Sequence, residues 1–369
     1  MRPFFEELWG NPSSMHTFGG QVGGAVRQAR EQVANLLGCH PSEVVFTSCG
    51  TESDSTAVRA AIASAPDKRH IITTRVEHPA IKNLYEHLSE HGYRVSFVPV
   101  DHQGRLDLDY LYAHLSEDTA VVSVMWANNE TGVLFPVEEI ARTVTERGIV
   151  FHTDAVQAVG KVPIDLSQNT ISMLSLSGHK LHGPKGIGAL YVRKGTRFSP
   201  FLIGGHQEHG RRGGTENVAS IVGLGKASEF SANHLAEENG RVKGLRDKLE
   251  TELLSRISNT MVNGDREHRL PNTTSIAFEY VEGESILLLM DGHGICASSG
   301  SACTSGSLEP SHVLRAMGVP FTAAHGSIRF SLSVYNTEEE IDFVIDKMPP
   351  IIERLREMSP FWKEYQQTA

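Results

Sequence analysis

The amino-acid sequence predicts an α/β fold: a large domain with a mainly parallel sheet and a smaller α+β domain at the C-terminal end. Short apolar runs alternate with longer helical patterns from about Glu43 to Tyr191, which is typical of crossover units that build a parallel sheet. After Gly214 this rhythm changes to a long helical pattern. A chain of 369 residues, 40% of them hydrophobic, is long enough for two domains.

We expect the large domain to contain strands with helices between them. The expected strands are Val44–Ser48, Ile71–Thr74, Val95–Val98, Val121–Val124, Ile149–Thr153, Met173–Leu176 and Ala189–Val192. The expected helices include Val22–Leu37, Ser53–Ala63, Ala80–His91 and Val137–Arg147. Pro136 opens the last of these, because its fixed φ suits a first helical turn.

The C-terminal part begins with a long helix that we expect to bridge the two domains. Its apolar residues recur at intervals of three and four and so share one face: Val242, Leu245, Leu249 and Leu253. The later elements are expected at Ser275–Phe278, Ser285–Asp291, Ile328–Ser331 and from Thr337 onward. Pro349 and Pro350 should interrupt the last helix, because proline removes a backbone donor. We therefore expect a large domain at residues 12–250 and a small one at 251–369 with 1–11.

Charge and composition exclude several classes of protein. The formal charge of −10 repels polyphosphate backbones, so nucleic-acid binding is disfavoured. The sequence lacks an apolar run long enough for a membrane helix and a secretion signal, and we expect a cytoplasmic protein. The four cysteines are too few and too irregularly spaced for a disulfide scaffold, so a special cysteine should be reactive.

Lys180 lies in a polar loop directly after the expected strand Met173–Leu176. Residues beyond the carboxyl ends of parallel strands line the ligand crevice, where a lysine with a lowered pKa can form a Schiff base with a carbonyl cofactor. The alternative is a surface lysine on a glycine-rich turn. The glycines do not form a phosphate-binding GxxxxGK motif followed by Ser or Thr.

Asp154 ends another expected strand, and a partly buried carboxylate there needs a cation. The protonated ring nitrogen of pyridoxal phosphate is one candidate. A salt bridge to an arginine explains the residue comparably well.

The Gly50-Thr51 turn opens a helix and could bind a phosphate, although helix capping explains it equally well. His78 and Asn129 follow two further strands. An imidazole there could stack on a flat ring and move protons, or both segments could be ordinary turns.

Cys303 lies in the Ser- and Gly-rich run Ala297–Ser307, which predicts an accessible loop cysteine that a neighbouring base would activate. We assign the other three cysteines to packing: Cys39, Cys49 and Cys296. Arg329, between apolar neighbours on a strand, could bind a carboxylate or form a structural salt bridge.

Nine motifs in order along nearly the whole chain resemble the pyridoxal-phosphate-dependent cysteine desulfurases of the class V aminotransferase family, most closely the nitrogen-fixation type. They are GNPSSMH, SCGTES, VEHPA, ANNETG, HTDAVQ, SGHKLHGPKGIG, GRRGGTENV, SSGSACTSGSLEPSHVLRAMG and SIRFSLS. The resemblance implies the pyridoxal-phosphate-dependent transferase fold of the aspartate aminotransferase type I.

The resemblance also implies roles for particular residues. Lys180 would bind the cofactor covalently, Asp154 would pair with the ring nitrogen, Gln157 would contact the ring hydroxyl, and His78 would stack on the ring as an acid–base group. The residues implied to hold the phosphate are Gly50, Thr51, Ser177, His179 and, from the partner protomer of a homodimer, Thr215.

On the substrate side, the resemblance implies that Asn129 and Arg329 bind the carboxylate of L-cysteine and that Cys303 is the nucleophile. Cys303 would receive the sulfur as a persulfide, release L-alanine, and pass the sulfur to an iron–sulfur scaffold protein, with nitrogenase as the implied destination. It would also be a transient iron–sulfur ligand shared with that scaffold.

Several alternatives stay open at this point. The chain could be a selenocysteine lyase, another class V enzyme such as an aminotransferase, or an inactive truncated form that binds a scaffold. Relatives usually begin with a strand and an Asp-Asn-Ala-Ala-Thr-Thr-like stretch, whereas this chain starts at Met1 with Arg-Pro-Phe-Phe, so we expect a start assigned too late or a shortened form. The aromatic tail Ser359–Trp362 could dock a partner or pack back on the protein.

Overall fold

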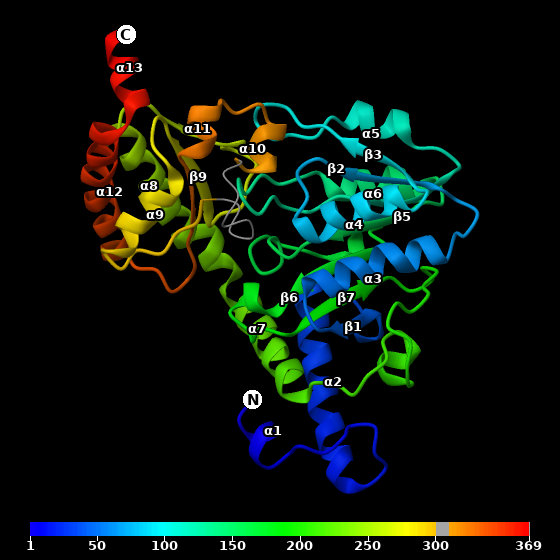
Figure 1. Ribbon diagram of the computed structural model, residues 1–369. Helices are drawn as coiled ribbons and strands as arrows, with labels where there is room; N and C mark the ends of the chain where they lie inside the picture. The colour runs from blue at the N-terminus through cyan, green and yellow to red at the C-terminus, as the bar shows by residue number, and fades with distance from the viewer. Residues whose placement is uncertain (300–309, 369) are drawn as a thin grey trace. The chain divides into compact units, whose positions relative to one another are not determined.

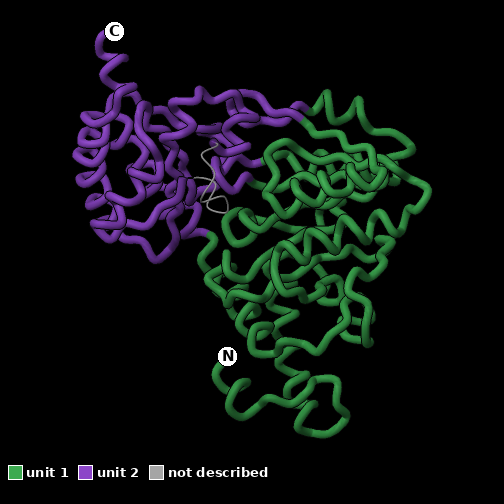
Figure 2. The backbone as a smooth tube through the Cα atoms, viewed as in Figure 1, with its two compact units in different colours: residues 1–98, 108–127, 135–235 green, residues 99–107, 128–134, 236–369 purple. Residues whose placement is uncertain are grey.

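The computed structural model describes residues 1–299 and 310–368. The chain divides into two compact units (Figure 2). Unit 1 comprises residues 1–98, 108–127 and 135–235, and unit 2 comprises residues 99–107, 128–134 and 236–369. The unit boundary at 235/236 lies before the domain boundary that the sequence predicts at 250/251, and the two short excursions of the chain into unit 2 have no counterpart in the predicted division. The predicted division into folding domains, at residues 12–250 and at 251–369 with 1–11, stays a prediction.

The core of unit 1 is a sheet of seven strands among the described residues, in the order β1-β7-β6-β5-β4-β2-β3 (Figure 1). The strands are β1 Val44–Thr47, β2 His70–Thr74, β3 Arg94–Val98, β4 Thr119–Ser123, β5 Val150–Asp154, β6 Met173–Ser177 and β7 Gly188–Val192. Strands β6, β5, β4, β2 and β3 are parallel to one another, whereas β7 is antiparallel to both β6 and β1. This confirms the predicted α/β class with a mainly parallel sheet.

The strand directions bring several carboxyl ends to one edge of the sheet. Since β7 is antiparallel to both of its neighbours, β1 runs in the same direction as β6 and the other parallel strands. Thr47, Asp154 and Ser177 therefore end their strands at the same edge, where ligands of open α/β sheets bind.

The α-helices of unit 1 are α1 Pro3–Glu6, α2 Thr17–Leu37, α3 Gly50–Ala63, α4 Pro79–Glu90, α5 Leu108–His114, α6 Val137–Glu146 and α7 Val218–Glu237, whose last two residues belong to unit 2. Helices α2 to α6 pack against strands of this sheet. Buried side chains of α3 and α4, among them Val58, Ile81 and Tyr85, pack with Ile71 and Val121 of the strands. Burying such side chains contributes roughly 1.5 to 3 kcal/mol each, which fixes α3 and α4 against the sheet.

Unit 2 contains a three-stranded antiparallel sheet in the order β10-β9-β8 within the described residues. Its elements are α8 Lys243–Arg256, β8 Thr260–Val262, β9 Thr273–Phe278, α9 Gly283–Asp291, α10 His312–Ala316, α11 Phe321–His325, β10 Ser327–Ser331, α12 Glu338–Met358 and α13 Pro360–Thr368. A π-helical turn, Glu238–Val242, joins α7 to α8. The predicted apolar face of this long helical segment is confirmed, because Val242, Leu245, Leu249 and Leu253 all lie in the core of unit 2.

The prediction that Pro349 and Pro350 interrupt the last helix is wrong, because α12 continues through both residues. The missing N–H groups deprive two carbonyls of helical bonds, at a cost of about 3 kcal/mol per proline. Burial before and after the prolines offsets this cost, since Ile341, Ile345 and Ile352 lie in the core of unit 2.

No helix of the described residues combines the length and the apolar character needed to cross a bilayer.

Candidate active site

Asp154 is a buried carboxylate at the carboxyl end of β5, with 5% of its surface exposed. Its Oδ1 accepts a hydrogen bond of 2.9 Å from the backbone N–H of Val156. Burial raises the pKa of Asp154 to about 6, and the Val156 N–H and the charge of Lys180 act in the opposite direction. A carboxylate in this position is stabilised further by a cation held against it.

Lys180 lies just beyond the neighbouring strand β6, in the 3₁₀ turn Gly178–Leu181, and its side chain is exposed. Ser177, the last residue of β6, forms a hydrogen bond of 2.8 Å between its Oγ and Nδ1 of His179. Burial and then the charges of Lys180 and Lys185 lower the pKa of His179, so its imidazole is neutral near pH 7. The turn thus presents an amine beside neutral hydrogen-bonding groups.

The N-terminus of α3 packs against both of these strand ends. A Cβ on Gly50 would lie 2.9 Å from Cγ2 of Val156 and 3.5 Å from Cβ of Ser177, so only glycine allows this approach. Cys49, at the N-cap position, makes no side-chain cap, which leaves the first turn at Gly50 and Thr51 suited to bind an anion. The structure therefore brings the segments of Gly50, Asp154 and Ser177 together.

His78 is the N-cap residue of α4 and is half-buried. Its Nδ1 accepts a hydrogen bond of 3.1 Å from the backbone N–H of Ala80. In the neutral imidazole the proton is consequently on Nε2. His78 can therefore offer an N–H donor at Nε2.

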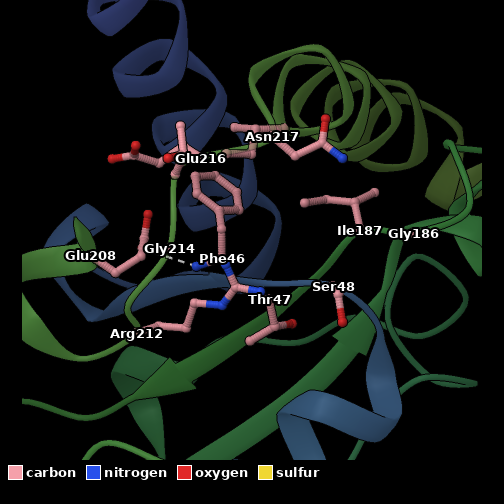
Figure 3. A pocket seen from close by; sticks show the side chains of 12 residues that line it. Phe46, Thr47, Ser48, Gly186, Ile187, Glu208, Arg212, Gly214, Glu216 and Asn217 are labelled. Carbon is pink, nitrogen blue, oxygen red and sulfur yellow. Dashed lines mark hydrogen bonds between the residues drawn. The ribbon is translucent and has the colours of Figure 1, made fainter. Parts of the chain in front are cut away.

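Gln157 follows Asp154 by three residues and is half-buried, and Thr215 is exposed. Thr215 lines a cavity of about 190 Å³ in unit 1. Figure 3 shows this cavity, with Thr47 and Ser48 on one side and Glu216 on the other. Thr215 thus lines the same cavity as Thr47, the last residue of β1, and Ser48, which precedes Thr51 by three residues.

In unit 2, the two residues predicted to bind a carboxylate lie together although 200 positions separate them. Nη1 of Arg329, on β10, donates a hydrogen bond of 2.5 Å to the backbone carbonyl of Asn129. The side-chain Oδ1 of Asn129 is buried and has no hydrogen-bond partner among the described residues. The hydrogen bond holds the Arg329 guanidinium against the backbone of Asn129, and a guanidinium and a side-chain amide are both groups that can bind a carboxylate.

The chain on both sides of the predicted nucleophile is tied to this pair. Ser298 forms a β-bridge with Arg329, and the Ser311 hydroxyl donates to the buried Glu130 carboxylate, next to Asn129. Cys303 itself lies outside the described residues, so the structure gives no geometry for the predicted nucleophile or iron–sulfur ligand.

The other cysteines and the tail differ in part from the predictions. Burial raises the pKa of Cys39 to about 12, which agrees with a packing role. Cys49 is half-buried. The packing assignment is wrong for Cys296, which is exposed because it lies in the loop after α9 and not within a regular element. Trp362 packs back on the protein: the centroid of its ring lies 4.5 Å from Cζ of Arg356.

Sequence reasoning missed four buried polar residues: Asp54, Glu77, His152 and Glu130. Asp54 could have been noticed because it is a charged residue on the otherwise apolar face of its helix. His152 shares the side of β5 on which Asp154 lies, because the two residues are two positions apart.

A separate group of exposed side chains has metal-ligand geometry. It lies on and just after α4 and consists of His87, Glu90 and His91, but exposed groups of this kind are common without an ion.

The fold and these two residue sets define a class V aminotransferase: the family model for aminotransferase class V matches residues 1–344, and the chain belongs to this family. It is 62% identical over 363 residues to the cysteine desulfurase NifS of Azotobacter vinelandii, covering 98% of this chain and 90% of that protein. It is 60% identical to a cysteine desulfurase of Gluconacetobacter diazotrophicus, covering 98% and 91% of the two chains.

Comparison with solved structures also finds NifS-like proteins. A NifS-like protein superposes with a TM-score of 0.90 at 40% identity, covering 96% of this chain and 94% of that one. A NifS-like protein from Rickettsia africae gives 0.84 at 33% identity, with coverages of 95% and 94%. Enzymes of this family depend on pyridoxal phosphate, and it is the cofactor of this chain.

Proposed function

We propose that this protein is a cysteine desulfurase that converts L-cysteine to L-alanine and transfers the sulfur to Cys303. The observation that supports this most directly is the arrangement at the sheet edge in unit 1. There, the buried Asp154 carboxylate, the Lys180 turn and the uncapped start of α3 come from segments in contact with one another.

These residues fit pyridoxal phosphate. Asp154 would pair with the ring nitrogen, and Gln157 would contact the ring hydroxyl. Ser177, His179 and the first turn of α3 would hold the phosphate, and Lys180 would bind the cofactor covalently. When bound, the protonated ring withdraws electrons from the substrate and weakens its carbon–sulfur bond.

The remaining residues act on the substrate. Asn129 and Arg329 orient its carboxylate. Two observations support this: the contact between them, and the buried Oδ1 of Asn129, which has no hydrogen-bond partner in the described part of the chain. His78 stacks on the cofactor ring and moves a proton at Nε2, the atom that its contact with Ala80 leaves protonated.

Cys303 completes the reaction as a thiolate. It attacks the substrate sulfur, so that a sulfur–sulfur bond forms while the carbon–sulfur bond breaks. The electron pair stays with the carbon skeleton, and its protonation gives L-alanine. The persulfide on Cys303 then supplies an iron–sulfur scaffold protein, with nitrogenase as the destination and Cys303 as a transient cluster ligand. The enzyme is a homodimer in which Thr215 completes the partner's phosphate site.

The role of Cys303 is tested with Cys303→Ser and, as a matched control, Cys296→Ser. We expect Cys303→Ser to abolish persulfide formation from L-cysteine while the visible absorbance of bound pyridoxal phosphate remains. Cys296→Ser should keep both properties, because Cys296 is exposed and has no part in the proposed reaction. Persulfide is measured by alkylation and mass spectrometry, and sulfur release by Cys303→Ser at the wild-type rate would refute the assignment.

A further inference from the structure

A buried chain of polar side chains lies behind Asp154 and crosses three neighbouring strands of unit 1. Nε2 of His152, on β5, is 2.9 Å from Oγ of Ser175 on β6. Its Nδ1 is 2.9 Å from Oγ of Ser123 on β4. The Ser175 hydroxyl also hydrogen-bonds the carboxyl group of Asp54 on α3. At most 1% of the surface of each of these four side chains is exposed, so their hydrogen bonds are made within the protein.

Among the described residues, the only basic group paired with Asp54 is an imidazole. It belongs to His152, whose Nε2 is 3.7 Å from Oδ1 of Asp54. Burial lowers the pKa of His152 to about 3, so this imidazole is neutral. Oδ1 of Asp54 has no hydrogen-bond partner in the described part of the chain. An ionised carboxylate with a buried, unpartnered oxygen is costly, whereas the carbonyl oxygen of a protonated acid costs much less.

Burial is the largest cause that raises the pKa of Asp54, and the nearby Asp154, Glu77 and Cys49 raise it further. The hydrogen bond with Ser175 acts in the opposite direction but does not outweigh them. Burial also raises the pKa of Glu77 to about 8. Buried carboxyl groups that share a site cannot all ionise, and Asp154 is the one favoured by the charge of Lys180.

We propose that Asp54 is a positioning residue that stays protonated in the holoenzyme, so that Asp154 is the single anionic carboxylate facing the pyridine ring. The Asp54 hydroxyl donates to Ser175, Ser175 donates to Nε2 of His152, and Nδ1–H of His152 donates to Ser123. This direction fixes the tautomer of His152 with its proton on Nδ1. An ionised Asp54 would reverse every bond in the chain and place the proton on Nε2. The inference rests on the proposed binding of pyridoxal phosphate at Asp154.

Two variants of Asp54 separate a neutral donor from a charge. In Asp54→Asn, the amide N–H₂ can donate to Ser175 as the acid does, and no charge changes. We expect its dissociation constant for pyridoxal phosphate to stay within about threefold of wild type and the pH titration of the visible cofactor band to be unmoved. In Asp54→Leu the donor is lost, and the buried Ser175–His152 pair is left unsatisfied. The affinity of this variant for the cofactor should fall about tenfold, the factor expected when a buried hydrogen-bond donor is removed and its partner is left unsatisfied.

A shift of the Asp54→Asn titration midpoint by about one pH unit would overturn the proposal, because it would show that a negative charge had been removed. Equal behaviour of Asp54→Leu and wild type would also overturn it. If Asp54→Leu fails to fold, selective ¹⁵N-histidine NMR of the holoenzyme decides, with the His152 signals assigned through His152→Asn. Protonation at Nδ1 supports the proposal, and protonation at Nε2 refutes it. Asp154→Asn is the separate test of the proposed function: if it binds the cofactor normally, the cofactor assignment fails whatever Asp54 shows.

Discussion

At the scale of single residues, unit 1 contains three buried acids that lie close enough to interact: Asp54, Glu77 and Asp154. Glu77, next to His78, is fully buried, and its Oε1 accepts hydrogen bonds from the Met125 N–H and the Thr74 hydroxyl. Burial, opposed by the Met125 N–H, raises its pKa to about 8. Such a residue makes folding stability depend on pH in a window that can be stated in advance.

We expect the holoenzyme to lose stability as pH rises from 6.5 to 8. The folded state binds the Glu77 proton more tightly than the unfolded chain does, so this contribution is complete below the ordinary glutamate pKa and is lost as pH rises through about 8. Glu77→Gln keeps the Oε1 acceptor and should remove about 1 to 2 kcal/mol of this pH dependence, given about 1.4 kcal/mol per pH unit for one proton.

The measurement is urea unfolding of wild type and Glu77→Gln at several pH values. His152 contributes in the opposite sense but at lower pH, because its pKa is lowered to about 3 and its stabilisation is lost as pH falls below about 6.5. Identical slopes for wild type and Glu77→Gln above pH 6.5 would show that Glu77 is ionised throughout.

At the scale of elements, the sequence predicts most of unit 1 because its strands are short apolar runs and β1, β2, β3 and β4 are each followed by a helix. Strand direction is not encoded in such runs, so the antiparallel placement of β7 does not follow from them. The three-residue strand β8 was missed because it has no buried apolar run to mark it. Packing decides the case of α12, where buried isoleucines outweigh two prolines that read as a break.

The candidate site also has residues that the sequence locates and contacts that it does not. Lys180, Asp154 and Arg329 could be located from the sequence because they adjoin predicted strands. Contacts between distant segments could not be, and the Arg329–Asn129 hydrogen bond is an example. The residues behind the site escaped notice because no local pattern distinguishes a buried histidine such as His152 from an ordinary strand residue.

The junction between α3 and the strand ends gives an element-scale prediction. Gly50→Ala would place a Cβ 2.9 Å from Val156, so the start of α3 must move away from the loop that follows Asp154. We expect the affinity for pyridoxal phosphate to fall about tenfold or more, because the phosphate site and the Asp154 loop lose their fit together.

Gly20→Ala is the matched control. Gly20 lies in α2, and a Cβ there meets nothing within 4 Å. This change should leave cofactor affinity unchanged and stabilise the fold by about 0.5 to 1 kcal/mol through helix propensity. Both effects are measured by equilibrium dialysis with pyridoxal phosphate and by thermal unfolding. Unaltered affinity in Gly50→Ala would mean that the α3 terminus is not part of the cofactor site.

At the scale of the whole molecule, the proposed homodimer makes each cofactor site depend on two chains. Lys180 belongs to one protomer of such a site and Thr215 to the other. A substitution of Lys180 therefore damages the site of its own chain, whereas a substitution of Thr215 damages the site of the partner chain. Mixed dimers can reveal this arrangement without any knowledge of how the protomers pack.

We expect Lys180→Ala to be inactive and Thr215→Ala to bind the cofactor weakly, because one donor to the phosphate is lost. A mixed dimer of these two variants contains one site with both residues intact and one with neither. It should therefore recover about half of the wild-type activity and bind one equivalent of pyridoxal phosphate per dimer tightly. If Thr215 instead served its own chain, the mixed dimer would contain one weakened site and one inactive site, and its affinity would match that of Thr215→Ala. Two differently tagged chains, refolded or co-expressed and purified through both tags, allow activity and cofactor stoichiometry to be measured on the mixed dimer alone.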